Sequence, residues 1–262
     1  MPSANSQNPQ YYRKGLAMEQ SKTSTRVLLT SAVILLFVLI TGPLGHKNQL
    51  TDLGPAITSV LIAVVGGVLV LLVSLVMLAM AMRRQWTKDK SLLLMAIVLS
   101  LVPLGLMAPN IIRAGAVPEI HDISTDTDNP PMFDAVVALR EGAANDLIYG
   151  TTTLSPEQHA ELQHEAYPQI QTKLSPLTVL AAVSRAGSIL AGQGLQIVSV
   201  NPEAGLVEST ATTFWFGFKD DLVVRIGTSD NGSKVDVRSV SRVGGSDLGA
   251  NAARIERFLL AF

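Results

Sequence analysis

The chain has 262 residues, of which 48% are hydrophobic, and its formal net charge at pH 7 is −1. It contains no cysteine, so disulfide bonds and thiolate metal sites are excluded. Residues 1–112 hold nine Lys and Arg against three acids, whereas the remainder holds eleven against eighteen. This asymmetry is typical of a membrane-proximal part joined to a water-facing part.

Three apolar stretches follow a polar N-terminal tail, residues 1–26, which is predicted to be a disordered cytoplasmic segment. They run over residues 27–44, 56–82 and 91–109, and no Asp, Glu, Lys, Arg or His lies between their ends. A hydrocarbon layer roughly 30 Å thick needs about 20 helical residues at ~1.5 Å each. The stretches therefore predict three transmembrane helices over residues 27–112, with the lipid bilayer as a partner.

The orientation follows from the cations, because Lys and Arg near the ends of spans tend to stay on the cytoplasmic side. Four precede the first stretch and four lie in Arg83–Lys90, whereas the first connection holds only Lys47. The pattern predicts a multi-pass inner (plasma) membrane protein of the bacterial cell envelope. Its N-terminus is cytoplasmic, and residues 113–262 are periplasmic or otherwise extracytoplasmic. The first stretch lacks a small-residue cleavage pattern and is expected to be retained.

The three stretches are expected to act as an anchor. Transporters and proton pumps keep ionisable groups at membrane depth, and these stretches have none. Gly66 and Gly67 permit close helix approach, either within a three-helix anchor or across a dimer.

The C-terminal part, residues 113–262, is predicted to be an α+β domain. Asn129-Pro130-Pro131 disfavours helix, and a short helix or irregular segment is expected over 133–145. Two helix starts follow, a capping box at Ser155 and a second N-cap at Ser175 whose helix ends near Ala191.

A period of two then replaces the helical pattern. It predicts strands over 196–201, 206–216, 221–228 and 234–243, followed by a last helix over 248–261. Short connections favour antiparallel neighbours, so the fold class is three transmembrane helices followed by a soluble domain with an antiparallel sheet of about four strands packed against helices.

The Asn231-Gly232 turn predicts the register of the last hairpin. A two-residue loop there places Val224 on the core face and pairs Arg225 with Arg238 on the opposite face. Two arginines directly opposite each other repel unless an anion lies between them.

An anion site is one interpretation of this region. The helix that starts after Gly244-Gly245, capped by Ser246 or Asp247, offers free amides and a favourable dipole. The candidate residues for a phosphate, carboxylate or lipid head group are Arg225, Arg238, Arg242, Ser246, Asn251 and Arg254. The alternative is an internal network of ion pairs in which Asp221, Asp236 and Asp247 hold the helix to the sheet.

No metal site and no cofactor are expected. His121, Asp122, Asp126 and Asp128 share one loop, but Asx turns explain these residue types there. A separate aromatic cluster, Phe214, Trp215, Phe216 and Phe218, alternates across strand faces. At least half of its members are expected in the core, and outward members are placed to touch lipid or Arg225.

Long motifs in the domain resemble a known family. They are HDISTDTDNPPMF at 121–133, Ala166-Tyr167-Pro168, FGFKDDLVVRI at 216–226 and VDVRSVSRVGGSDLGANAARI at 235–255. They resemble the bacterial and plastid family catalogued as domain of unknown function 1499, over nearly all of residues 117–262. The resemblance implies a membrane-tethered envelope domain, and several bacterial members likewise place helices before it. It carries over no catalytic residue.

The sequence therefore favours a non-enzymatic integral membrane protein with an extracytoplasmic binding domain. Its expected partner is an anionic lipid, a cell-wall component or another membrane protein, and nucleic acid is not expected. The alternative is a membrane-anchored hydrolase or transferase acting on a lipid or cell-wall substrate, with Asp122, Asp126 or Asp221 as acid or base. That alternative requires paired carboxylates in a cleft.

Overall fold

The computed structural model describes residues 21–150 and 154–262 of the chain, so most of the predicted tail lies outside the described residues. Two compact units divide the chain. Among the described residues, the N-terminal unit comprises 21–43 and 51–107, and the C-terminal unit comprises 44–50, 108–150 and 154–262.

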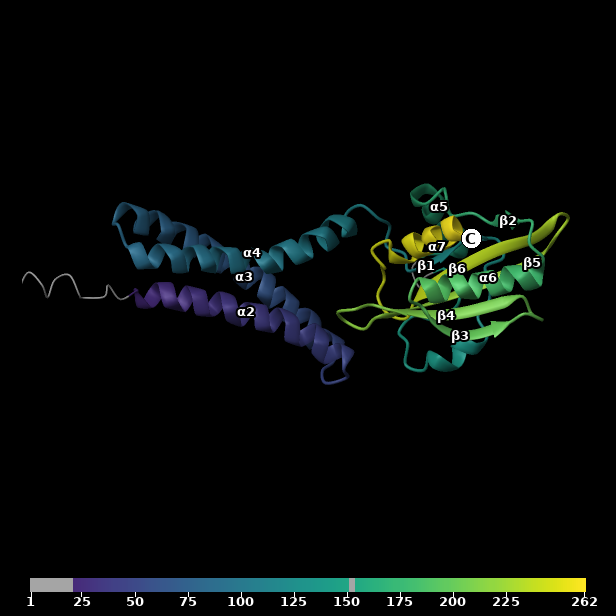
Figure 1. Ribbon diagram of the computed structural model, residues 1–262, viewed down its shortest axis with the longest axis horizontal. Helices are drawn as coiled ribbons and strands as arrows, with labels where there is room; N and C mark the ends of the chain where they lie inside the picture. The colour runs from purple at the N-terminus through teal and green to yellow at the C-terminus, as the bar shows by residue number, and fades with distance from the viewer. Residues whose placement is uncertain (1–20, 151–153) are drawn as a thin grey trace, which may run out of the picture. The chain divides into compact units, whose positions relative to one another are not determined.

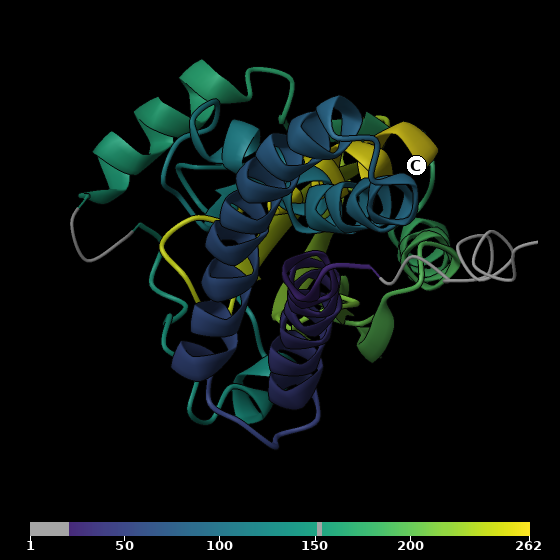
Figure 2. The ribbon, with the colours of Figure 1, turned by 90° about the vertical axis from the view of Figure 1, so that its left-hand side faces the viewer.

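Three long helices supply the N-terminal unit, although the last residues of the first and third belong to the C-terminal unit. All three are long and apolar enough to cross a membrane. They are α2 (Thr23–Lys47), α3 (Leu53–Arg83) and α4 (Thr87–Ala114). Figures 1 and 2 show them in purple to blue, running beside one another. Each extends past the apolar stretch that predicts it, because helical hydrogen bonding continues into the flanking residues.

Small residues set the close packing of these helices. A Cβ added to Gly67 would lie 3.1 Å from the carbonyl oxygen of Ser100 in α4. A Cβ on Gly66 would lie 2.7 Å from Cδ2 of Leu35 in α2. The predicted close approach at this glycine pair is therefore made inside one chain, with α3 between its two neighbours.

The C-terminal unit is built on an antiparallel sheet of six strands, so the predicted α+β fold class is confirmed. The four long strands are β3 (Gln196–Asn201), β4 (Leu206–Thr212), β5 (Lys219–Ser229) and β6 (Gly232–Ser241). Two short strands, β1 (Asp122–Ser124) and β2 (Lys173–Ser175), pair side by side with the other edge of β6. Three residues carry too little periodicity to be read as a strand from sequence.

Helices α6 (Val179–Gly192) and α7 (Ala250–Ala261) pack on one face of the sheet, here called the first face, as Figure 1 shows. The main core lies between them and the strands, and it includes Ala186, Leu190, Leu222, Val224, Val237, Ile255 and Phe258. The predicted N-cap at Ser175 is wrong, because that residue ends β2. Thr178 caps α6 instead, and its Oγ1 accepts a hydrogen bond from the amide of Ala181.

The β5–β6 register differs by two residues from the predicted one. Ser229 pairs with Gly232, so Arg225 pairs with Asp236 and not with Arg238. Gly232 begins β6 at a φ of 139°, where a Cβ would lie 2.2 Å from the carbonyl oxygen of Ser175. The predicted division into two faces holds, because a shift of two residues keeps every side chain on its own face.

Helix α5 (Pro156–Ala166) covers the outer edge of β1 and begins with the predicted capping box at Ser155. The side-chain amide of Gln163 accepts from the Ser124 amide at 2.9 Å and donates to the Ser124 carbonyl at 2.7 Å. His159 Nε2 lies 2.6 Å from the Asp122 carbonyl oxygen. These side chains thereby supply hydrogen bonds that another strand would otherwise make.

The second face of the sheet is covered by the segment of residues 125–149, here called the cover segment. It has little regular structure beyond η1, a 3₁₀ helix over Ala135–Leu139, within the range predicted as a short helix or irregular segment. Phe133 and Val136 pack on Val223 and Val240 of the sheet. This apolar contact is small, so polar groups hold much of the cover segment in place.

Candidate functional site

A fully buried ion pair joins β1 to β6 beneath the cover segment. Arg238 is 1% exposed, and its Nε and Nη2 atoms donate to the two carboxylate oxygens of Asp122 at 3.0 and 2.7 Å. The same guanidinium donates to the carbonyl oxygens of Pro131 and Leu147 at 3.2 and 2.9 Å. Because a buried charge must be paired and hydrogen-bonded, this arginine joins the two strands and the cover segment.

A second buried carboxylate, Asp221, accepts from two arginines. Arg140 of the cover segment donates at 2.6 Å and Arg242 donates twice at 2.8 Å, while Thr210 adds a hydrogen bond at 2.7 Å. Burial raises the pKa of Asp221, but the hydrogen bonds from these neighbours outweigh it and hold the pKa below its usual value. This carboxylate therefore stabilises the fold at neutral pH, and the contribution is lost as the pH falls below about 4.

Arg225 lies in a third group of charges at the far end of the same face. Its Nη2 donates to Asp126 at 3.0 Å and to Asp236 at 2.8 Å, and Lys234 contacts the same two carboxylates at 3.1 and 3.5 Å. Burial raises the pKa of Asp126, but the Asn129 amide and the two cations lower it below its usual value. The two positive and two negative charges balance each other.

The remaining candidates lie between α7 and the first face of the sheet. Arg254 donates to Asp220 at 2.8 Å and to Asn251 Oδ1 at 2.6 Å. The carboxylate of Asp247 accepts from the amides of Gly249 and Asn251 at 2.8 and 2.7 Å. Ser246 Oγ accepts from the Leu248 amide at 3.2 Å, before the helix begins. Gly249 is the N-cap of α7, and of the two predicted caps Asp247 is the one that accepts from an amide in the first turn.

The six residues of the predicted anion site are therefore divided between the two faces of the sheet. Each of the four arginines already contacts a carboxylate, namely Asp122, Asp126, Asp220, Asp221 or Asp236. An anion site over these residues stays a prediction. The contacts have the form of the alternative, an internal network, in which Asp221 and Asp236 make ion pairs and Asp247 makes a helix cap.

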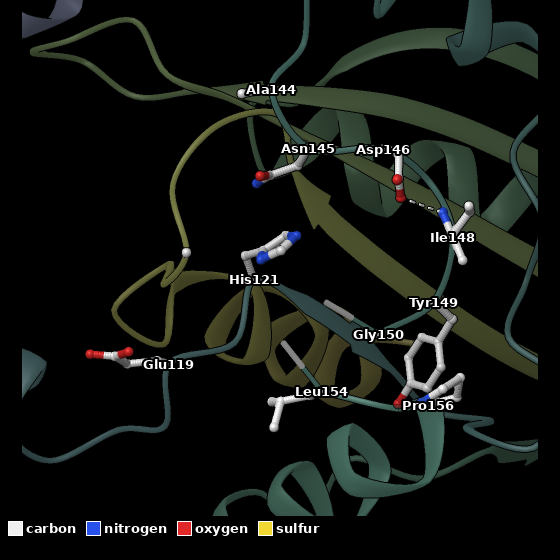
Figure 3. Close-up of a pocket in the computed structure, with 11 residues that line it drawn as sticks. Glu119, His121, Ala144, Asn145, Asp146, Ile148, Tyr149, Gly150, Leu154 and Pro156 are labelled. Carbon is white, nitrogen blue, oxygen red and sulfur yellow. Dashed lines mark hydrogen bonds between the residues drawn. The ribbon is translucent and has the colours of Figure 1, made fainter. Parts of the chain in front are cut away.

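A pocket of about 480 Å³ opens at the start of β1, next to the cover segment. Its lining includes Glu119, His121, Asn145, Asp146, Ile148 and Tyr149. Figure 3 shows the His121 imidazole in the middle of the labelled residues, with Asn145 on one side and Tyr149 on the other. The Asn145 amide is held by the carbonyl oxygens of Ser241 and Gly244 at 3.1 and 2.9 Å, which fixes that wall.

Two of the described residues that line this pocket have a buried polar atom without a hydrogen-bond partner. These atoms are Nδ1 of His121 and Oη of Tyr149, and Nδ1 of the described residue His159 likewise lacks a partner. The His159 ring contacts Tyr149 edge-on, with ring centroids 4.9 Å apart. A buried group left unsatisfied costs about 1–3 kcal/mol, so a hydrogen-bonding ligand here would recover part of that energy.

The charge of the lining restricts the class of ligand. Burial raises the pKa of Tyr149 and lowers the pKa of His159, so both side chains are neutral at pH 7. Glu119 and Asp146 contribute exposed carboxylates, and none of the described lining residues is Lys or Arg. A neutral or cationic ligand therefore suits the pocket better than an anion.

The carboxylates named from sequence as acid or base lie outside this pocket. Asp122 and Asp221 are buried in ion pairs, and Asp126 contacts Arg225 and Lys234. Within residues 21–150 and 154–262, no group of three or more His, Cys, Asp or Glu side chains could hold a metal ion. Sequence reasoning missed Asn145 and Tyr149 as site residues, because they belong to a segment without periodicity or a motif.

These features define a class: three long apolar helices followed by an α+β domain with a polar pocket at one end of its sheet. The family model described as protein of unknown function (DUF1499) matches residues 122–262, more than half of the chain. The chain belongs to this family, which confirms the resemblance. The match begins at β1 and includes the whole sheet. Comparison with curated proteins and with solved structures returns no match.

The buried Asp122–Arg238 pair generates a stability prediction. The substitution Arg238→Met leaves the Asp122 carboxylate buried without a cation, so we expect the free energy of unfolding to fall by about 3–5 kcal/mol. The measurement is urea unfolding of the full chain in detergent micelles, followed by Trp fluorescence. The double variant D122L/R238M buries no charge and should regain most of that loss.

Lys234→Met is the matched control, because this lysine is partly exposed in its ion pairs. Its effect should stay below about 1 kcal/mol. Equal losses in R238M and K234M would contradict the special role of the buried pair.

Proposed function

We propose that this chain is an integral membrane protein whose C-terminal domain lies on the extracytoplasmic side and binds a small envelope component in the pocket beside His121. The placement is supported by the cation pattern, with four Lys and Arg before the first apolar stretch and four between the second and third stretches. Three crossings then bring the C-terminal unit to the side opposite the N-terminus.

The observation that carries the binding proposal is the unpartnered Nδ1 of His121. The side chain is 9% exposed, yet it lines a pocket large enough for a sugar or a lipid head group. An imidazole nitrogen can donate or accept a hydrogen bond with a ligand, depending on the tautomer of the ring. With two carboxylates nearby, the favoured ligand presents hydroxyl or ammonium groups.

This ligand class differs from the anionic component expected from sequence. The arginines that supported an anion already contact carboxylates, whereas the pocket itself is lined by acidic and neutral groups. Binding is also favoured over the hydrolase or transferase alternative. That alternative assigned acid–base roles to Asp122, Asp126 and Asp221, and none of them lines the pocket.

Binding can be tested with three head-group probes of different charge: N-acetylglucosamine, ethanolamine and glycerol phosphate. The neutral or cationic probe should raise the unfolding temperature of the full chain in lipid nanodiscs, because binding to the folded state stabilises it. Ile148→Trp, at a lining residue that is 76% exposed, should fill the pocket and abolish the shift. His121→Leu should abolish it by removing the hydrogen-bonding group.

Leu180→Trp is the matched control for Ile148→Trp, because it adds the same ring to an exposed position on α6. This variant should keep the shift of the wild-type chain. A shift produced only by glycerol phosphate, a shift that persists in I148W, or no shift with any probe would each overturn the proposed site.

The side of the membrane is tested separately, using the absence of native cysteine. Single cysteines at the exposed positions Lys88 and Lys219 are treated in intact cells with a membrane-impermeant maleimide. We expect K219C to react in intact cells and K88C to react only after lysis. The reverse pattern would place the C-terminal domain in the cytoplasm.

A further inference from the structure

The loop between β4 and β5, residues 213–218, concentrates aromatic side chains at one end of the sheet. Its sequence, Thr-Phe-Trp-Phe-Gly-Phe, holds three of the seven Phe and one of the two Trp residues of the chain. We propose that this aromatic loop rests on the surface of the bilayer that anchors the chain, with Phe214 and Trp215 at the level of the lipid head groups.

The aromatic loop has a defined shape. The amide of Thr213 donates to the Phe218 carbonyl at 2.8 Å, and the Phe218 amide donates to Thr213 Oγ1 at 2.9 Å. Phe216 and Phe218 stack with centroids 4.8 Å apart, and Trp215 meets Phe216 edge-on at 6.5 Å. The rings are also held by residues at the end of α2 that belong to the same unit: Lys47 Nζ donates to the Phe214 carbonyl at 2.9 Å, and the His46 and Phe218 rings meet edge-on. This order lowers the entropy cost of binding a surface.

These rings do not serve the core of the domain. None of the four belongs to either hydrophobic cluster, so the expectation that at least half of them lie in the core is wrong. Phe214 is 85% exposed, the most exposed large apolar side chain among the described residues. β4 ends at Thr212, earlier than predicted, so the aromatic residues lie in the turn instead of along a strand face.

The length of the tether favours the bilayer as the occupant of this surface. Helix α4 ends at Ala114 and β1 begins at Asp122, and the residues between them span at most roughly 30 Å when extended. A domain of this size has a radius of gyration of about 15 Å. The tether therefore keeps the domain within about one domain diameter of the end of α4, so its surface stays close to the bilayer.

The chemistry of the aromatic loop suits that surface. Trp is enriched at the interface of membrane proteins, where its apolar ring and its N–H group are both accommodated. The exposed Lys219 follows the loop directly and can reach lipid phosphates. A protein partner with an apolar groove is the other occupant that this surface could take, and the experiment distinguishes the two.

The two tryptophans make the proposal measurable. The variant Trp86→Phe leaves Trp215 as the only tryptophan in the full chain, and excitation at the red edge of the Trp band avoids the tyrosines. It is reconstituted into phosphatidylcholine vesicles with and without bromine atoms on the acyl chains. We expect brominated lipid to remove most of the Trp215 emission, and bromines near the head group to quench more than bromines near the terminal methyl.

A matched control carries its only Trp on α6, in the variant W86F/W215F/L180W. Its emission should be unaffected by brominated lipid and should be quenched by iodide in solution. The proposal is overturned if Trp215 behaves like this control in pure lipid vesicles, which is also the outcome that a protein-binding loop would produce.

A second variant covers the case in which loss of Trp86 impairs folding. Phe214→Cys keeps both tryptophans and takes a nitroxide label at the tip of the loop. We expect the label to be more accessible to oxygen than to a water-soluble nickel chelate in vesicles. Accessibility equal to that of a label at exposed Leu180 would overturn the proposal.

Discussion

The C-terminal unit depends on the pairing of charges buried on the second face of its sheet. Apolar contact there is limited to a small cluster around Val223 and Val240, and the cover segment has little secondary structure of its own. Arg238 meets this constraint by joining Asp122 to two carbonyl oxygens of the cover segment. Either charge would be destabilising if it were buried without its partner. The two strands and the cover segment therefore depend on the Asp122–Arg238 pair for their stability.

The same interactions position the pocket. His121 directly precedes Asp122, so the ion pair fixes the start of β1 from which the imidazole projects. The Tyr149 ring lies over the Arg238 guanidinium, with 5.6 Å between the ring centroid and Cζ. The buried Asp122–Arg238 pair thereby orients the His121 and Tyr149 side chains that line the pocket. Charged residues next to a binding pocket can therefore have a structural role.

The parts of the fold that follow from sequence are those with a repeating local pattern. The three apolar helices, the four long strands and the capping box at Ser155 each have a period or a motif that backbone geometry requires. The two faces of the β5–β6 hairpin are also predictable. The register of this hairpin is not predictable from the Asn-Gly motif. Gly232 lies outside the turn, at the start of β6, where it packs against Ser175.

The candidate site was less accessible to sequence reasoning. Arg238 and Arg242 are recognisable as a cluster in sequence. However, Asp122, which pairs with Arg238, and Arg140, which shares Asp221 with Arg242, come from segments that are distant in sequence and have no regular pattern. The pocket has the same origin, since Asn145 and Tyr149 belong to the cover segment. Long-range contacts of irregular chain carry no periodic signal, so such a site becomes visible only in the folded structure.

The dependence of the cover segment on the sheet is tested most directly by native-state hydrogen exchange on the unmodified full chain. The amides of Asp134 and Ala135 donate to the Glu208 carboxylate at 2.6 Å, and the amides of β6 belong to the sheet. If buried charges make cover and sheet one cooperative unit, both groups of amides exchange with the same opening free energy. Fast exchange at Asp134 and Ala135 while β6 stays protected would contradict the account.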